Sequence, residues 1–114
     1  MLSSTRRFHG YSSLNWAYRH GDSIRDQQIS LKYALNSRRQ TYRAAVVVSR
    51  KVSRLAVVRN RIRRRVYEAI LAHEKSINGS FDLIFNVYSA DVATLSNLEL
   101  NNLITSLLKR AKVI

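Results

Sequence analysis

The chain has 114 residues and no cysteine, which fits one domain over residues 1–114 and excludes disulfides and thiolate metal sites. Its formal net charge is +13, and because such an excess of one sign costs folding free energy by self-repulsion, it indicates a polyanionic partner. Since no apolar run approaches the roughly 20 residues that span a bilayer, and the N-terminal segment lacks a signal-peptide core, we expect a cytoplasmic protein with no membrane partner.

The first predicted elements are a helix over 12–20 and a strand over 28–35. Ser12 or Ser13 can cap the helix, and Gly21 can end it in a left-handed turn. The strand has the period-two alternation of a half-buried strand, with apolar side chains at Ile29, Leu31, Tyr33 and Leu35.

A second strand is predicted over 41–49 and a third over 81–88. A polar connection of hairpin length, 36–40, joins the first two strands, so we expect them to be antiparallel neighbours. The third strand is apolar at nearly every position, which indicates a central place in the sheet.

Two further helices are predicted, one over 56–74 and one that begins near Ser96. In the first, a helical period runs through Val58, Ile62, Val66, Ala69, Ile70 and His73. Ser96 and Glu99 have the spacing of a capping box, and the apolar stripe that follows is Leu100, Leu103, Ile104, Leu107, Leu108 and Ala111. The order αββαβα predicts an α+β fold, a two-layer α-β sandwich with helices packed on a small sheet.

The positive charge is concentrated in one stretch of the chain. Residues 27–67 contain twelve Lys or Arg and no Asp or Glu, whereas residues 68–114 contain four bases and five acids. Arginine outnumbers lysine fifteen to five. Because the planar guanidinium group binds phosphate with two donors and stacks on bases, this composition favours a nucleic-acid partner.

The most informative feature is a basic loop, 50–55, followed by the basic start of the second predicted helix. Five arginines fall within the seven residues 59–65, and like charges at i, i+4 spacing destabilise a helix. Asn60 is neutral among them and can cap the helix, bond to its neighbours or bind RNA. A solvated charged face is the competing interpretation, but a stretch this long without an acid favours a rigid basic surface for phosphates.

Several motifs resemble the bacterial ribonuclease P protein subunit family. The signature is the segment Ala56-Val57-Val58-Arg59-Asn60-Arg61-Ile62-Arg63-Arg64, preceded by Val48-Ser49-Arg50-Lys51-Val52. Tyr18-Arg19-His20-Gly21 resembles the family's aromatic-x-x-Gly segment that closes the first helix, and Asp82-Leu83-Ile84 resembles its third strand. The resemblance runs through about residues 7 to 110.

The chain departs from the usual family pattern in three places. Ser53-Arg54-Leu55 stands where a glycine often occurs, and Leu14 stands where the family often has an aromatic residue. After the third strand, Val87-Tyr88-Ser89 replaces a segment that often contains basic residues and a Pro or Gly.

The resemblance implies a protein that assists an RNA catalyst. In that family the catalytic RNA binds Mg²⁺ and hydrolyses a phosphodiester to remove the 5′ leader of precursor tRNA, so the partners are catalytic RNA and precursor tRNA. The cofactor Mg²⁺ is then bound mainly by the RNA, and no catalytic or metal-binding residue is expected in the protein. The family also implies a left-handed crossover between the strands at 41–49 and 81–88, against the general right-handed rule.

Two sets of binding residues are expected. The resemblance assigns the basic helix to the catalytic RNA, and the expected contacts are Arg54, Arg59, Asn60, Arg61, Arg63, Arg64 and Arg65. A single-stranded leader is held by a basic groove with stacking side chains, and the candidates are Leu14, Tyr18, Lys32, Arg43, Ser49, Arg50 and Lys51. Tyr18 can equally be a core aromatic of an amphipathic helix, and Lys32 and Arg43 can be solvated surface residues of neighbouring strands.

Three other functions fit the sequence less well. A structural ribosomal protein is the main alternative, although such proteins often carry long basic extensions that this chain lacks. A DNA-binding regulator is disfavoured because a strand, rather than a helix, leads into the basic helix. A nuclease acting alone would need clustered carboxylates or two poised histidines, whereas the seven acids are scattered, and His9, His20 and His73 are better explained as surface or capping residues.

Overall fold

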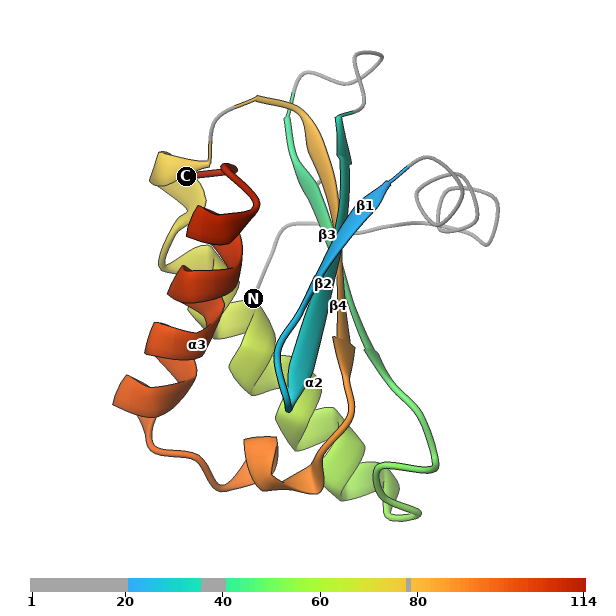
Figure 1. Cartoon of the computed structure of the whole chain (residues 1–114). Coiled ribbons are helices and arrows are strands. Elements are labelled where there is room, and N and C mark those ends of the chain that lie inside the picture. The colour runs from blue at the N-terminus through green and yellow to red at the C-terminus, as the bar shows by residue number, and fades with distance from the viewer. Residues whose placement is uncertain (1–20, 36–40, 78) are drawn as a thin grey trace.

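The computed structural model describes residues 21–35, 41–77 and 79–114, which form a four-stranded sheet packed against two helices (Figure 1). The strands are β1 (Asp22–Arg25), β2 (Ile29–Leu35), β3 (Arg43–Val48) and β4 (Phe81–Val87). The helices are α2 (Ala56–Leu71) and α3 (Asn97–Arg110), with short 3-10 turns η2 (Glu74–Ser76) and η3 (Ala90–Ala93). The helix predicted over 12–20 and the connection at 36–40 lie outside the described residues.

The strand order is β1-β2-β4-β3, which corrects the predicted pairing of the first two long strands. β2 and β3 are not neighbours, because β4 lies between them, antiparallel to β2 and parallel to β3. The physical reason is that β4 is buried along almost its whole length and gains most from a neighbour on each side. Its predicted central position is therefore confirmed, and α2 forms the crossover between the parallel strands β3 and β4.

The short strand β1 is not predicted from the sequence. Its four residues include one apolar side chain, Ile24, so they carry no alternating pattern. The strand forms because a tight turn brings it back along β2, with the Asp26 N–H donating to the Ile29 carbonyl at 3.0 Å.

The core lies between one face of the sheet and the two helices, which cover the same side of it (Figure 1). The predicted stripe of α2 is confirmed by buried Ile62, Val66, Ala69 and Ile70. The stripe of α3 is confirmed by buried Leu100, Ile104, Leu107 and Leu108. None of the described helices is long and apolar enough to cross a membrane.

The helix ends follow local chemistry. Ser96 caps α3 as predicted, because its Oγ accepts a hydrogen bond from the Glu99 N–H at 3.1 Å. α2 starts without a side-chain cap, since Leu55 stands at that position. It ends at Leu71, three residues before the predicted boundary, and the chain continues through His73 into η2.

The opposite face of the sheet, here called the polar face, carries a buried ion pair. The Arg43 Nε and Nη2 donate to the two carboxylate oxygens of Asp82 at 2.9 and 2.8 Å, across the parallel pair β3 and β4. Asp82 is 0% exposed and Arg43 is 9% exposed. The Arg43 guanidinium group, expected at a leader-binding surface, thus neutralises a buried carboxylate, and its contact with a leader stays a prediction.

We expect Asp82→Ala to lower the free energy of unfolding by about 3 kcal/mol, because it leaves the buried Arg43 charge uncompensated. Urea unfolding of the two proteins measures the difference. Asp26→Ala is the control: that carboxylate lies 3.9 Å from Arg110 in a more exposed pair and should cost less than about 1 kcal/mol. Similar losses for both variants would contradict the structural role of the Arg43–Asp82 pair.

Candidate nucleic-acid interface

The loop between β3 and α2 is held against the helix that follows it. The Val52 N–H donates to the Ser49 carbonyl at 3.1 Å and so closes a turn directly after β3. The Arg59 Nη1 donates to the Ser53 carbonyl at 2.8 Å, which ties the loop to the first turns of α2. Exposed cations on this loop therefore project from a fixed backbone.

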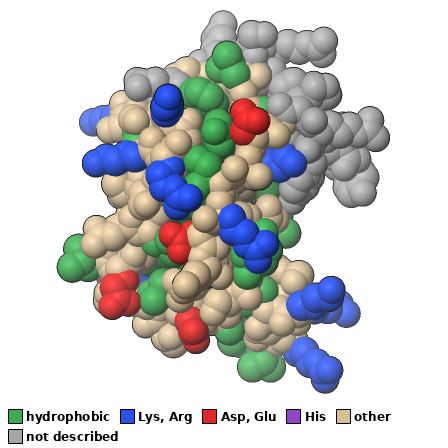
Figure 2. All heavy atoms as spheres, in the orientation of Figure 1, with side chains coloured by type: hydrophobic (Ala, Val, Ile, Leu, Met, Phe, Trp, Pro, Cys, Tyr) green, Lys and Arg blue, Asp and Glu red, His purple; other side chains and the backbone are tan. Residues whose placement is uncertain are grey.

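Four cations surround one concavity at this junction. Arg50, Lys51, Arg54 and Arg59 line a hollow of about 500 Å³, here called the basic hollow. Figure 2 shows Lys and Arg side chains projecting at the lower right, where Figure 1 places this loop and the start of α2. No acidic side chain of the described residues lines the hollow, so its field is uniformly positive and suits phosphate oxygens.

A second hollow of about 370 Å³ lies along the next part of α2 and is lined by Val57, Val58, Asn60, Arg61 and Arg64. Asn60 does not cap the helix, since Leu55 stands at that position. It bonds to a neighbour instead: its side-chain oxygen accepts a hydrogen bond from Arg63. Val57 is 73% exposed, so the hollow that Arg64 also lines includes an accessible apolar side chain. Such a surface can contact a nucleotide through both its phosphate and its base or ribose.

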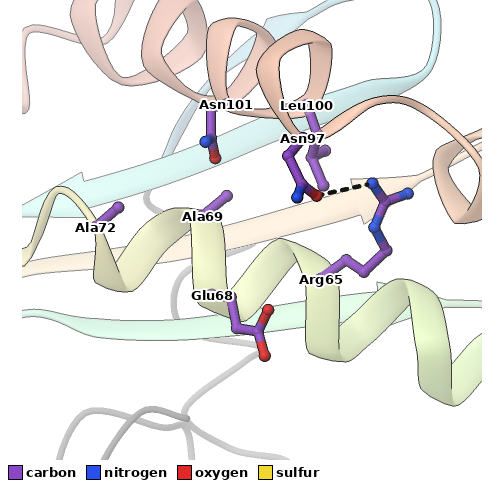
Figure 3. A pocket seen from close by; sticks show the side chains of 7 residues that line it. All are labelled: Arg65, Glu68, Ala69, Ala72, Asn97, Leu100 and Asn101. Atoms are coloured by element: carbon purple, nitrogen blue, oxygen red, sulfur yellow. Dashed lines mark hydrogen bonds between the residues drawn. The ribbon is translucent and has the colours of Figure 1, made fainter.

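Arg61 and Arg65 have a different environment from the other arginines of α2. The Arg61 Nε donates to the Ala93 carbonyl at 3.0 Å. Arg65 donates to the carbonyls of Val92 and Leu95, and its Nη2 lies 3.3 Å from the Asn97 Oδ1, the contact drawn in Figure 3. The two guanidinium groups thus connect α2 to the segment that leads into α3.

The structure therefore divides the residues predicted to bind the catalytic RNA. Arg54 and Arg64 are exposed, and neither makes a hydrogen bond or ion pair within the described parts of the chain. Arg59 and Arg63 each make one contact that also fixes local structure. Sequence reasoning missed the anchoring role of Arg65, because no local pattern shows that η3 folds back against α2.

The residues predicted to bind a leader are also separated. Ser49, Arg50 and Lys51 are exposed in the loop after β3, and Lys32 is half-buried on the polar face. Leu14 and Tyr18 lie outside the described residues. The prediction placed Arg50 and Lys51 in one RNA site and Arg54 and Arg59 in another, whereas all four line the same basic hollow.

Comparison with known proteins supports a single family. The family model described as Ribonuclease P matches residues 2–112. The ribonuclease P protein component of Pseudanabaena sp. is 30% identical over 115 residues, covering 100% of this chain and 97% of that protein. The corresponding protein of Chloroflexus aurantiacus is 39% identical over 75 residues, and the match covers 66% of this chain but little more than half, 55%, of that protein.

The fold is also found among solved structures. The Staphylococcus aureus RNase P protein superposes with a TM-score of 0.84 at 26% sequence identity, covering 95% of this chain and 96% of that chain. The RNase P protein from Thermotoga maritima superposes with a TM-score of 0.75 at 21% identity, covering 85% of this chain and 89% of that chain.

We expect Arg65→Met to lower the free energy of unfolding by about 2 kcal/mol, because it removes charged hydrogen bonds to the backbone between η3 and α3. Arg64→Met is the matched control, since it removes an exposed arginine from the adjacent position and should change stability by less than about 0.5 kcal/mol. Thermal or urea unfolding compares the two. Equal stabilities would show that the Arg65 hydrogen bonds contribute nothing to folding.

Proposed function

Because the chain belongs to the ribonuclease P protein family, we propose that it forms part of an endoribonuclease complex with the RNase P RNA and promotes removal of the 5′ leader from precursor tRNA. It would do so by binding both the catalytic RNA and the leader. Family membership disfavours the ribosomal protein and the DNA-binding regulator that the sequence alone left open.

The observation that carries this proposal is the basic hollow. Its four cations come from a loop and a helix that hydrogen bonds hold together, so little backbone entropy remains to be lost when RNA binds. Preorganised positive charge binds a polyanion tightly because counterions are released from the phosphates. The hollow is thus a surface for a nucleic-acid backbone.

The catalytic RNA would lie along the N-terminal half of α2. Arg64 on the helix and Arg54 in the loop before it offer guanidinium groups that bind no other described residue, and Asn60 and Arg63 present a paired amide and cation. Arg61 and Arg65 contribute by fixing the helix, although their charge still adds to the local field.

The leader would approach from the end of β3, where Ser49, Arg50 and Lys51 are exposed. Since Arg50 and Lys51 share the hollow with Arg54 and Arg59, leader and catalytic RNA would meet the protein side by side. Their phosphates repel one another, and cations placed between them reduce that repulsion. The protein would therefore favour precursor tRNA over mature tRNA.

In this proposal the RNA, and not the protein, carries out the metal-dependent chemistry. Mg²⁺ prefers oxygen ligands and commonly binds phosphates, which the RNA supplies in abundance. In the described parts of the chain, no group of three or more His, Cys, Asp or Glu side chains is placed to hold a metal ion. The role proposed for the protein is to neutralise phosphate charge, which lowers the Mg²⁺ concentration needed for the folded complex.

We expect Arg54→Ala/Arg64→Ala to weaken association with the catalytic RNA by about ten-fold or more, with little change in unfolding free energy. The slope of log K against log salt should fall by about 0.7 to 0.9 for each phosphate that the variant no longer neutralises. Lys75→Ala/Lys109→Ala is the charge-matched control, because both lysines are exposed outside the two hollows. An equal loss of affinity in both pairs would show that net charge, rather than this surface, drives binding.

We expect the chain to raise cleavage of precursor tRNA by the cognate RNA at low Mg²⁺, because it supplies part of the charge neutralisation that Mg²⁺ otherwise provides. Lys51→Ala should weaken binding of a precursor with a long leader more than binding of a substrate without one. Steady-state cleavage and competition binding measure both effects. Cleavage of transcripts by the purified chain in the absence of the RNA would contradict the proposed division of labour.

A further inference from the structure

Tyr88 is an exposed aromatic ring held in a fixed position. The residue directly follows β4, and its N–H donates to the Gln28 carbonyl at 2.8 Å. The Tyr88 Oη lies 2.8 Å from the Ser30 Oγ, and the Arg25 guanidinium carbon lies 4.7 Å from the ring centroid. Despite these three interactions the residue is 47% exposed.

Tyr88 lies at the end of the polar face where the basic loop begins. Val87 pairs with Val48 in the parallel β3–β4 register, and both valines belong to the core on the helix side. Side chains alternate between faces along a strand, so Tyr88 and Ser49, the next residues, turn toward the polar face. Ser49 begins the segment that carries Arg50 and Lys51 into the basic hollow.

The centre of the polar face is more buried than this end, because even Lys32, which pairs with Ile84, is half-buried there. Ile84 and Asp82 are 0% exposed, so a nucleotide cannot contact them in this structure. Arg25 and Ser49 are exposed, and with Tyr88 they form the accessible end of the face. A single strand that leaves the basic hollow along the sheet therefore meets the tyrosine ring first.

The chemistry of this cluster suits an unpaired nucleotide. Bases stack on aromatic rings with little dependence on sequence, and a neighbouring cation can bind the attached phosphate. The hydrogen bond between the Ser30 and Tyr88 hydroxyls would satisfy a buried tyrosine equally well, so that bond alone does not explain why the ring is exposed. Arg25 and Tyr88 together provide both parts of a nucleotide site.

We propose that Tyr88 and Arg25 form a stacking site for one unpaired nucleotide of the leader, with its base on the face of the Tyr88 ring that Arg25 does not cover and a phosphate of the strand beside Arg25. This inference rests on the proposed function, since it names a contact within leader binding. The family pattern often has basic residues after this strand, where the chain has Val87-Tyr88-Ser89. The contact here would thus depend on stacking more than on charge.

The test is a double-mutant cycle in the assembled complex of chain and catalytic RNA. Precursor tRNAs each carry one abasic nucleotide at a different leader position, and their affinities are measured with the wild-type chain, Tyr88→Leu and Tyr88→Phe. We expect one leader position at which loss of the base weakens wild-type binding by about five-fold or more. At that position Tyr88→Leu should bind intact and abasic precursors equally, whereas Tyr88→Phe, which keeps the ring, should behave like the wild type.

The stacking site would be overturned if, at every leader position, removing the base weakened binding by the same factor for the wild type and for Tyr88→Leu. Association of Tyr88→Leu with the catalytic RNA, and its unfolding midpoint, are measured alongside to exclude misfolding. If Tyr88→Leu is too unstable to assemble, Arg25→Met is compared with the wild type instead. It should reduce the slope of log K against log salt for long-leader precursors and not for leaderless substrates. If the wild-type chain does not bind the catalytic RNA at all, the proposed function fails first, and the two failures are thereby distinguished.

Discussion

The structure depends on how helix α2 remains folded while it carries five arginines within seven residues. Repulsion along an isolated helix of this composition would disfavour it, because like charges one turn apart destabilise helices. Two features compensate for this. Ile62, Val66 and Ile70 are fully buried against the sheet and α3, and the Arg61 and Arg65 guanidinium groups bind backbone carbonyls near η3. The helix therefore holds the remaining cations at fixed positions in solvent.

This anchoring links stability to function on the same helix. Arg61 and Arg65 hold α2 against the segment that leads into α3, and the cations that line the two hollows, Arg61 among them, face solvent on the same helix and loop. A surface that is positive before RNA arrives needs little reorganisation on binding, which is the condition for tight and rapid association with a polyanion. The basic loop takes part in the same arrangement because Arg59 ties the Ser53 carbonyl to α2.

The contrast between Arg43 and Tyr88 shows that residue type alone does not determine which side chains are accessible. Arg43 has the charge expected of a leader-binding residue, but Asp82 on the neighbouring strand neutralises it inside the protein. Tyr88 belongs to no motif that predicts a role, yet its ring is accessible and is placed by Ser30 and Arg25. The difference lies in the β2–β4–β3 register, which sets the neighbours of each side chain.

The sequence by itself determined the family, the α+β class, the apolar stripes of α2 and α3, the Ser96 cap and the central place of β4. Each of these follows from local spacing or from a motif of contiguous residues, so neighbours in the chain carry the information. Only the tertiary structure decided that β4 separates β2 from β3, that β1 pairs with β2, that Arg43 is buried against Asp82 and that Arg65 anchors η3. Apart from the β1–β2 hairpin, those features join residues far apart in the chain, and the energies of all of them come from pairing and burial that no local pattern encodes.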